Sequence, residues 1–444
     1  MKQKSTSSRQ NFLQRRYGVR LGRRYALAAA SVVLMSVIGC SPLNRDNSAT
    51  AESQQPRTEL PISKKSVNPD TKIVAANTKF GFKLFSEVLK SDAGKNVFVS
   101  PSSVAFALAM TYNGASGSTQ QEMAKALELQ GLTLQQINSS NAALKALLEN
   151  PDPKVQLAIA NSLWGNQNTS FNPDFLQRNR DFYQAKIANL NFTDAQAPGT
   201  INDWVKQNTG GKIEKIVQKI NPDQALFLVN AIYFKGSWTN EFDKQQTREY
   251  PFSLASGQQK QHPMMSQKGK YKYLENPEFQ AVNLPYGNNG RISLYVFLPK
   301  QNSNLKAFFQ TLKAENWDKW MSQFSKREGS IRLPKFKIDY DITLNNTLKA
   351  LGMGQAFSSK ANFSGMGNGK NFAISEVKHK TFVEVNEQGT EAAAATSVGI
   401  MPLSAPVPTY APFQMIVDRP FFCAIRDNQT GSIIFMGSIA EPLS

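Results

Sequence analysis

The sequence predicts an α+β fold in which helices cover a main β-sheet. Helical periodicity appears early, over 77–90, whereas the continuous apolar runs 226–234 and 292–298 are typical of buried strands. The chain has 444 residues and is 41% hydrophobic, which is enough for one large core. No repeat of about 20 to 50 residues is present, so a solenoid or a propeller is not indicated.

The predicted elements follow in chain order. Apolar residues spaced along one helical face predict a helix over 77–90. Ser100 and Pro101 open an apolar run that ends near residue 110, and this pair is typical of the start of a second helix. The capping-box spacing of 119–122 predicts a third helix. Alternation at period two over 380–385 predicts a strand.

The composition excludes several classes of protein. With 41% hydrophobic and 19% charged residues, the chain is neither collagen, nor a coiled coil, nor a polytopic membrane protein, nor mostly disordered. Two Cys and two His are too few for a disulfide scaffold, a zinc finger, an iron–sulfur site or a multi-His metalloenzyme. We therefore expect no metal and no cofactor.

The formal net charge of +18 is concentrated at the N-terminus. Residues 1–40 contain eight Lys or Arg and no acid, so the remainder carries 43 basic against 33 acidic residues, about +10. No dense Lys/Arg stripe with interleaved aromatic residues occurs in that remainder. A mildly basic surface is therefore expected, and nucleic-acid binding is not; activation by a heparin-like polyanion stays open.

The N-terminus has the features of an export signal. Residues 1–24 are basic, and the apolar run 25–38 is shorter than the roughly 20 residues of a membrane-spanning helix. Gly39 before Cys40 resembles a bacterial lipobox, which predicts that Cys40 is lipidated and becomes the mature N-terminus. An ordinary signal peptide or a short anchor helix are the alternatives, and the paired arginines point only weakly to twin-arginine export.

Three segments of the chain follow from this signal. Residues 1–39 are predicted to be a lipoprotein-type signal peptide, 40–74 a flexible tether rich in Asn, Thr, Ser, Gln and Pro, and 75–444 the folded domain. We expect an exported protein, anchored to a membrane and facing the periplasm or the cell exterior, or else secreted. If Cys40 is acylated, Cys423 has no partner, and its apolar surroundings predict a buried, inert thiol.

Catalytic motifs are absent from the sequence. It contains no G-x-S-x-G, H-E-x-x-H or G-x-x-x-x-G-K-[ST] motif. The glycine-rich stretch 365–369 is expected to be a loop. His262 is placed in a polar turn and His379 at the entry of a strand, and neither has a serine in a nucleophile context. An enzyme, including a lipid-anchored one, is therefore not expected.

An alanine-rich segment near the C-terminus is the most informative part of the sequence. Four alanines favour a helix, yet Gly389 and the prolines from Pro402 onward prevent a long one. At period two, one face carries only small uncharged residues, namely Thr390, Ala392, Ala394 and Thr396. The other face carries Glu391, Ala393, Ala395 and Ser397. The segment is therefore either a strand that fits over a buried layer or a flexible Ala/Gly linker.

From about residue 75 to the end, the chain resembles the serpins, inhibitors that trap proteases. The motifs occur in the family's order, and each is modest alone. They are Asn96–Pro101 for the opening of the central buried helix, Leu228–Trp238 for the third main-sheet strand, Ile331–Phe336 for another strand of that sheet, and Asp418–Phe421 with Phe435–Ser438 for the closing strands. The most specific match is the hinge, which comprises Glu387, Gly389, Thr390, Glu391, Ala392, Ala393, Ala394, Ala395 and Thr396.

The resemblance implies a serpin fold, with a central, mostly antiparallel sheet A, additional sheets, about nine helices and an exposed reactive-centre loop over about 387–412. It implies a monomeric suicide substrate: a protease cleaves the loop, forms an acyl-enzyme, and is trapped when the hinge enters the sheet. About fifteen residues at about 3.3 Å each would carry the protease roughly 50 Å. A non-inhibitory chaperone or carrier, or a cysteine-protease inhibitor, would share this fold.

The resemblance also implies roles for individual residues. Ser100, Ser103, Asn230 and His379 match the polar cluster beneath the sheet, called the shutter, where the strands must part. A satisfied strand histidine is the alternative for His379. Trp238, Lys335 and Glu387 match the breach, where insertion starts, and an ion pair between Lys335 and Glu387 is a hypothesis.

The family's spacing from Glu387 places the reactive bond sixteen residues further on, at Leu403–Ser404. A leucine before the bond suits an apolar specificity pocket, so chymotrypsin-like, elastase-like or subtilisin-like proteases are the expected targets. The loop beyond Ser404 is longer and richer in proline than usual, which keeps Met401 and Tyr410 open as the bait residue.

Overall fold

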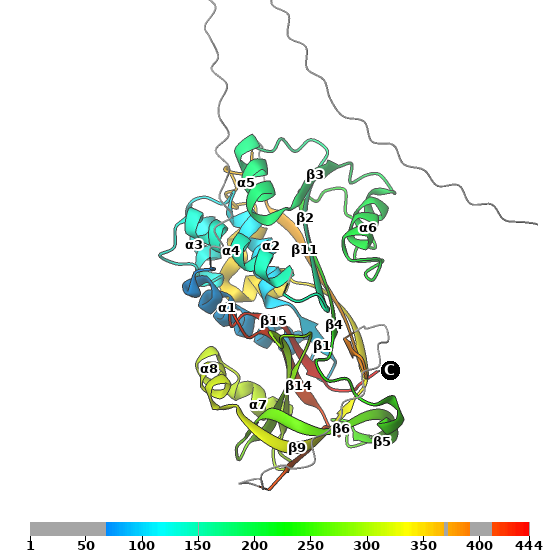
Figure 1. Ribbon diagram of the computed structural model, residues 1–444. Coiled ribbons are helices and arrows are strands. Elements are labelled where there is room, and N and C mark those ends of the chain that lie inside the picture. The colour runs from blue at the N-terminus through cyan, green and yellow to red at the C-terminus, as the bar shows by residue number, and fades with distance from the viewer. Residues whose placement is uncertain (1–67, 150, 368–371, 391–410, 444) are drawn as a thin grey trace, which may run out of the picture. The chain divides into compact units, whose positions relative to one another are not determined.

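The computed structural model describes residues 68–149, 151–367, 372–390 and 411–443. The predicted signal peptide, Cys40 and most of the predicted tether lie outside these residues, as do Glu391–Thr396 of the hinge and the predicted reactive bond Leu403–Ser404. The described residues form two β-sheets and nine α-helices (Figure 1). This arrangement confirms the predicted α+β class.

The six-stranded sheet is the main sheet of the fold. Its order is β10 (Phe336–Thr343), β11 (Ile374–Asn386), β12 (Gly389–Thr390), β4 (Leu226–Ser237), β2 (Val155–Asn166) and β3 (Lys186–Leu190). Four of its six pairings among the described strands are antiparallel. The parallel ones join β2 to β3 and β11 to β4, so the two central long strands run in the same direction.

A nine-stranded sheet packs beside it. Its order is β1 (Val97–Val99), β15 (Ile433–Ile439), β14 (Phe421–Asp427), β8 (Ile292–Pro299), β7 (Phe279–Pro285), β6 (Gln259–Glu275), β9 (Ser325–Pro334) and β13 (Phe413–Ile416), with β5 (Arg248–Ser253) beside β6. The motif 331–336, expected in the main sheet, is divided between the two sheets. Residues 331–334 end β9, Lys335 is the crossover, and only Phe336 enters the main sheet.

Helices cover both faces of the main sheet, and two of the nine described helices pack on the nine-stranded sheet instead. The helices are α1 (Thr71–Ser91), α2 (Pro101–Tyr112), α3 (Gly117–Ala126), α4 (Leu134–Glu149), α5 (Pro173–Tyr183), α6 (Ala197–Asn208), α7 (Leu305–Thr311), α8 (Ala314–Gln323) and α9 (Asn345–Leu348), with short turns at Lys244–Gln246, Lys349–Met353 and Gly354–Phe357. Figure 1 shows α6 and α2 on opposite sides of β2 and β4.

Strand β4 separates two hydrophobic cores. Its residues alternate between them: Leu228, Ile232 and Phe234 belong to the large core, and Val229 and Tyr233 to a smaller one beneath α6. Every residue of α2 is buried, so this helix lies inside the large core under the sheet. A strand added beside β4 therefore presents alternate residues to a packed interior.

The observed helix starts agree with the sequence in one case and differ in two. Ser100 precedes α2 with Pro101 in its first turn, as expected. Helix α1 begins at Thr71, six residues early and inside the predicted tether, because the Asp70 side chain accepts a hydrogen bond from the Lys72 N–H. The capping box at 119–122 is wrong: Thr119 and Glu122 accept backbone N–H groups of the segment 355–362 instead.

Candidate functional site

The start of the hinge already lies in the main sheet. Gly389 and Thr390 form the two-residue strand β12, which pairs antiparallel with both neighbours. Gly389 has φ of 151°, and a Cβ there would lie 2.0 Å from the Gly236 carbonyl oxygen. Only glycine fits so close to the backbone of β4. The predicted strand conformation is therefore present at the hinge residues that the structure describes.

Beyond β12, toward the N-terminal ends of β4 and β11, the main sheet is closed. From 226 to 233, β4 pairs directly with residues 374–382 of β11, and the two strands run parallel. They separate only near their C-terminal ends, where Val385 faces Thr390 on one side and Gly236 faces it on the other. Strand β12 thus fills the open end of a gap whose remainder is shut.

Aromatic side chains hold β12 from below. The Thr390 hydroxyl is buried and lies 2.8 Å from the Tyr286 hydroxyl. The Tyr286 ring stacks on Trp238, with 4.3 Å between their centroids. Trp238 in turn donates its indole N–H to the Asn386 carbonyl at 2.9 Å. Trp238 thus lies where the resemblance placed it, whereas Tyr286 was missed because it lies far from the hinge in the sequence.

The ion pair between Lys335 and Glu387 is present. Lys335 Nζ lies 3.1 Å from Glu387 Oε2, and the Thr247 hydroxyl donates to Glu387 at 2.9 Å. Burial raises the pKa of the Glu387 carboxyl, but the hydrogen bonds it accepts and the Lys335 charge outweigh this and lower it overall. Glu387 is therefore charged at neutral pH and fixes the hinge to the crossover between the two sheets.

The four residues expected beneath the sheet are brought together. Ser100, Ser103, Asn230 and His379 are all fully buried. The Asn230 amide donates to Ser103 Oγ at 2.5 Å, and the Ser100 backbone N–H donates to His379 Nε2 at 3.1 Å. Asn230 and His379 face each other in the β4–β11 ladder, 2.5 Å apart between Oδ1 and Nδ1. Asn161 of β2, which the sequence reasoning missed, also accepts from Asn230.

The bonding of His379 fixes its charge state. Because Nε2 accepts a hydrogen bond, Nδ1 carries the proton and donates it to Asn230. Burial lowers the pKa of His379 to about 3. The imidazole is therefore neutral in the folded protein, and its environment is that of a hydrogen-bonded structural residue.

The other two candidate residues are structural. His262 was placed in a turn, but it lies buried in β6 and donates from Nε2 to the Lys335 carbonyl at 2.5 Å. Cys423 is free and fully buried in β14, and burial raises the pKa of its thiol. The glycine-rich stretch makes close backbone contacts as far as it is described: a Cβ on Gly367 would lie 1.9 Å from the Ser170 carbonyl.

The part of the chain described here holds no group of three or more His, Cys, Asp and Glu placed to bind a metal ion. In the same ranges, no helix is both long and apolar enough to cross a bilayer. One hollow of about 830 Å³ lies between α1 and α7, and its lining includes Leu89, Phe309 and the cations Lys90 and Lys306.

The comparisons with known proteins agree with this geometry. The family profile described as "Serpin (serine protease inhibitor)" matches residues 75–442. Leukocyte elastase inhibitor of Bos taurus is 36% identical over 380 residues, 83% of this chain and 99% of that protein.

Two solved structures are similar to the described fold. The native thermophilic serpin tengpin has a TM-score of 0.78 at 34% identity, covering 84% of this chain and 95% of its own. Human thyroxine-binding globulin complexed with thyroxine has a TM-score of 0.77 at 28% identity, covering 84% and 99%. The chain belongs to the serpin family of serine protease inhibitors.

Proposed function

We propose that the chain inhibits serine endopeptidases as a suicide substrate, with the loop beyond Thr390 as the bait. One observation carries the proposal: β12 already pairs antiparallel on both sides in the opened end of the β4–β11 gap. Membership of the serpin family and the elastase inhibitors among the relatives support protease inhibition in general. Cleavage of the loop would free it to extend β12 between β4 and β11, toward the N-terminal ends of these two strands.

The register of β12 defines how far such an extension can go. Continuing it places Ile400 opposite Leu226, where β4 begins, and Met401 opposite Ile374, where β11 begins. Pro402, which lacks a backbone donor, is the next residue and lies beyond both ladders. The gap therefore takes residues up to Met401, which favours a cut at Leu403–Ser404 over one at Tyr410.

The same register assigns a partner to each hinge residue. Ala392 would face Phe234 and Val383 on the core side, and Thr396 would lie between Asn230 and His379. Glu391 would point to the other face, beside Lys235 and Glu384. Small residues are needed on the core side because α2 fills the space below, and this is the side that has them.

Insertion would be driven by the sheet itself. It replaces one parallel ladder between β4 and β11 with two antiparallel ladders, and antiparallel pairing is the more stable per residue. The net gain is on the order of ten backbone hydrogen bonds, each worth about 1 kcal/mol. The uncut loop is tied at both ends, which opposes this move until the loop is cleaved.

The trapped species is an acyl-enzyme. The protease serine attacks the carbonyl carbon of Leu403, the amine of Ser404 leaves with a proton, and the ester that remains is hydrolysed unless insertion comes first. Leucine suits chymotrypsin-, elastase- and subtilisin-like proteases. A cut after Met401 would also allow the whole strand to insert, but no residue would remain between the strand and the protease. Mass spectrometry of the cleaved loop distinguishes this cut from one after Leu403.

A protease panel tests the proposal. The mature protein is incubated with chymotrypsin-, elastase- and subtilisin-type enzymes and with one papain-type enzyme, and the products are run on a denaturing gel. We expect an SDS-stable complex with a Leu-preferring serine protease, and a cleaved form that melts well above the intact one. Cleaved product without a complex, and without a higher melting temperature, would contradict inhibition.

We further infer that the protein is an exported lipoprotein anchored through Cys40. The basic residues before 25–38, the short apolar run itself and Gly39 before Cys40 support this. Cys40→Ser in the full-length chain should move the protein from the membrane fraction to the soluble exported fraction. Retention of this variant in the membrane would point to the apolar run as the anchor.

A carrier function is the second candidate, because the hollow between α1 and α7 is large enough for a small amphipathic ligand. Its apolar lining and the exposed Lys306 suit an anionic one, and human thyroxine-binding globulin, which is similar in fold, has been solved in complex with thyroxine. Equilibrium dialysis with thyroxine as the probe tests this. Binding that Phe309→Asp abolishes, in a chain that forms no protease complex, would favour the carrier.

A further inference from the structure

A row of exposed lysines crosses two adjacent strands of the nine-stranded sheet. Lys268, Lys270 and Lys272 alternate along β6 and share its outward face. Lys326 of β9 is exposed directly opposite Lys272 in the ladder. Of the four, only Lys270 has an ion pair with another described residue, at 3.3 Å from Glu328. Two like charges directly opposite destabilise a sheet, so the Lys272–Lys326 pair has no structural benefit.

The lysines lie between the two ends of the reactive loop. At one end, Arg327, next to Lys326, donates to the Ala411 carbonyl at 3.4 Å, just before β13. At the other end, Phe242 donates its N–H to the Glu387 carbonyl at 2.8 Å. A hollow of about 400 Å³ lies on the side of Phe242, and its lining contains Trp238 and Phe242 together with Lys270, Lys272 and Lys326.

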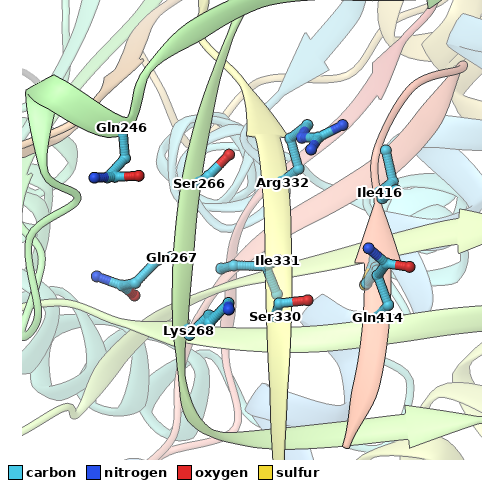
Figure 2. A pocket seen from close by; sticks show the side chains of 10 residues that line it. Gln246, Ser266, Gln267, Lys268, Ser330, Ile331, Arg332, Gln414 and Ile416 are labelled. Carbon is cyan, nitrogen blue, oxygen red and sulfur yellow. The ribbon is translucent and has the colours of Figure 1, made fainter.

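The basic surface continues toward β13. Figure 2 shows β6, β9 and β13 side by side around a second hollow, of about 430 Å³, with Lys268 and Arg332 in its lining. The remaining lining residues are uncharged, and none is acidic. The Arg332 guanidinium lies 3.7 Å from the centroid of the Tyr250 ring, which holds it at this surface.

A protease bound to the loop must cover this surface. Ser404 is seven residues from Ala411, so the proposed bond lies at most about 25 Å from the place where the loop meets Arg327. A protease of about 230 residues has a radius of gyration of about 17 Å and hence a diameter of about 45 Å, which exceeds this 25 Å span. Its surface around the active site therefore lies over or beside the lysines.

We propose that the row Lys268, Lys270, Lys272 and Lys326 is a docking surface for an acidic region next to the active site of the target protease. The proposal rests on the inhibitory function proposed above. Charges at such a rim act on encounter, by steering the partner, and have little effect once it is bound. The lysines should therefore raise the rate of association and leave the partition between trapping and hydrolysis unchanged.

The test compares two variants with the same loss of charge. In the first, Lys268, Lys272 and Lys326, which have no ion pair with a described residue, become Gln. In the second, Lys186, Lys215 and Lys219 become Gln; they are also exposed but lie toward the other end of the main sheet, away from the hinge. Second-order association rates are measured with two Leu-cleaving serine proteases, one of isoelectric point below 5 and one above 9.

At about 20 mM salt, the first variant should associate about fivefold more slowly with the acidic protease and no more slowly with the basic one. The difference should shrink at 300 mM salt, and the stoichiometry of inhibition should stay that of the wild type. Equal slowing by the control variant, or no slowing by the first, would overturn the proposal. So would a wild type whose only charge effect is acceleration by added heparin, since that indicates a polyanion site.

Failure of the inhibitory function gives a different result. If the protein is only a substrate, no SDS-stable complex forms, but kcat/KM for cleavage of the loop still reports the encounter with the protease. A charge effect on kcat/KM without a complex would retain the docking surface and reject the inhibitor. A stable complex without the charge effect would do the reverse.

Discussion

The gap between β4 and β11 is held open at one end and closed in its middle. At the C-terminal ends of the two strands, β12 separates them, and Tyr286 and the Lys335–Glu387 pair fix the inserted residues. In the middle, Asn230 and His379 join the same two strands directly through side chains that are fully buried. The comparison indicates that insertion is already begun at the breach and that the remaining barrier lies at the shutter.

The largest effect is expected from a charged side chain in the hinge that blocks insertion into the gap. Ala392→Arg places a guanidinium toward the core between Phe234 and Val383, where an unpaired charge costs several kcal/mol. Insertion should stall, and the stoichiometry of inhibition should rise at least tenfold with cleavage intact. Counting cleaved against complexed protein on a denaturing gel measures this.

Glu391→Arg is the matched control for this variant. It places the same side chain one residue earlier, on the other face, beside Lys235 and Glu384. It should inhibit nearly as well as the wild type. Equal loss in both variants would show that the register of β12 does not continue into the loop.

The next effect is at the breach. Glu387→Lys removes the ion pair, places two cations together and frees the Thr247 hydroxyl, so the start of the hinge should no longer be fixed. We expect faster loss of the active form at 37 °C, with polymers or an inserted, inactive monomer on a native gel. Glu387→Gln keeps the Thr247 bond and should lie between this variant and the wild type. An unchanged active lifetime in Glu387→Lys would count against a holding role for this pair.

Much of the breach and shutter could be predicted, partly from local alternation and partly from resemblance to the family. The alternation of Thr390, Ala392, Ala394 and Thr396 needs only the period of a strand, and resemblance to the family supplied the four shutter residues. Tyr286, Thr247 and Asn161 were missed because each reaches the site from a distant segment through a single side chain. No periodicity in the sequence marks such a contact.

The errors have the same origin. Thr119 and Glu122 have capping-box spacing, but the segment 355–362 offers them backbone donors, and tertiary contacts prevail. Pro263 next to His262 suggested a turn, yet Pro263 is tolerated in β6 opposite Glu249 of the short strand β5. Residues 331–336 read as one strand because nothing local marks the change of sheet at Lys335.

Acid should lower the free energy of unfolding by protonating His379 of the shutter in the unfolded chain. His379 has a pKa of about 3 when folded and an ordinary pKa near 6.5 when unfolded, so the unfolded chain binds more protons between these values. Its contribution is complete above pH 6.5 and is lost as the pH falls toward 3, by about 2 kcal/mol between pH 7 and 5. Urea unfolding at a series of pH values measures this.

Two variants separate His379 from the rest of the molecule. His379→Gln should flatten the stability profile between pH 7 and 5 because it removes the titrating group. His262→Gln serves as the comparison, since burial lowers the pKa of His262 in the same direction. A profile that keeps its slope in His379→Gln and loses it in His262→Gln would place the acid sensitivity in β6, outside the gap.

The smallest expected effect is a difference in stability between the intact and the cleaved protein when a hinge residue predicted to reach the shutter is changed. Insertion must break the bond between Asn230 and His379, and the projected register brings the Thr396 hydroxyl between them as a replacement partner. Thr396→Ala should therefore leave the intact protein unchanged but destabilise the cleaved form by about 1 kcal/mol, the value of one buried hydrogen bond. Ser397→Ala, on the opposite face, should change neither form. Calorimetry of cut and uncut protein reads both, and an equal shift in the two forms of Thr396→Ala would mean that Thr396 already contacts the shutter before cleavage, so that the gap opens earlier than the closed β4–β11 ladder indicates.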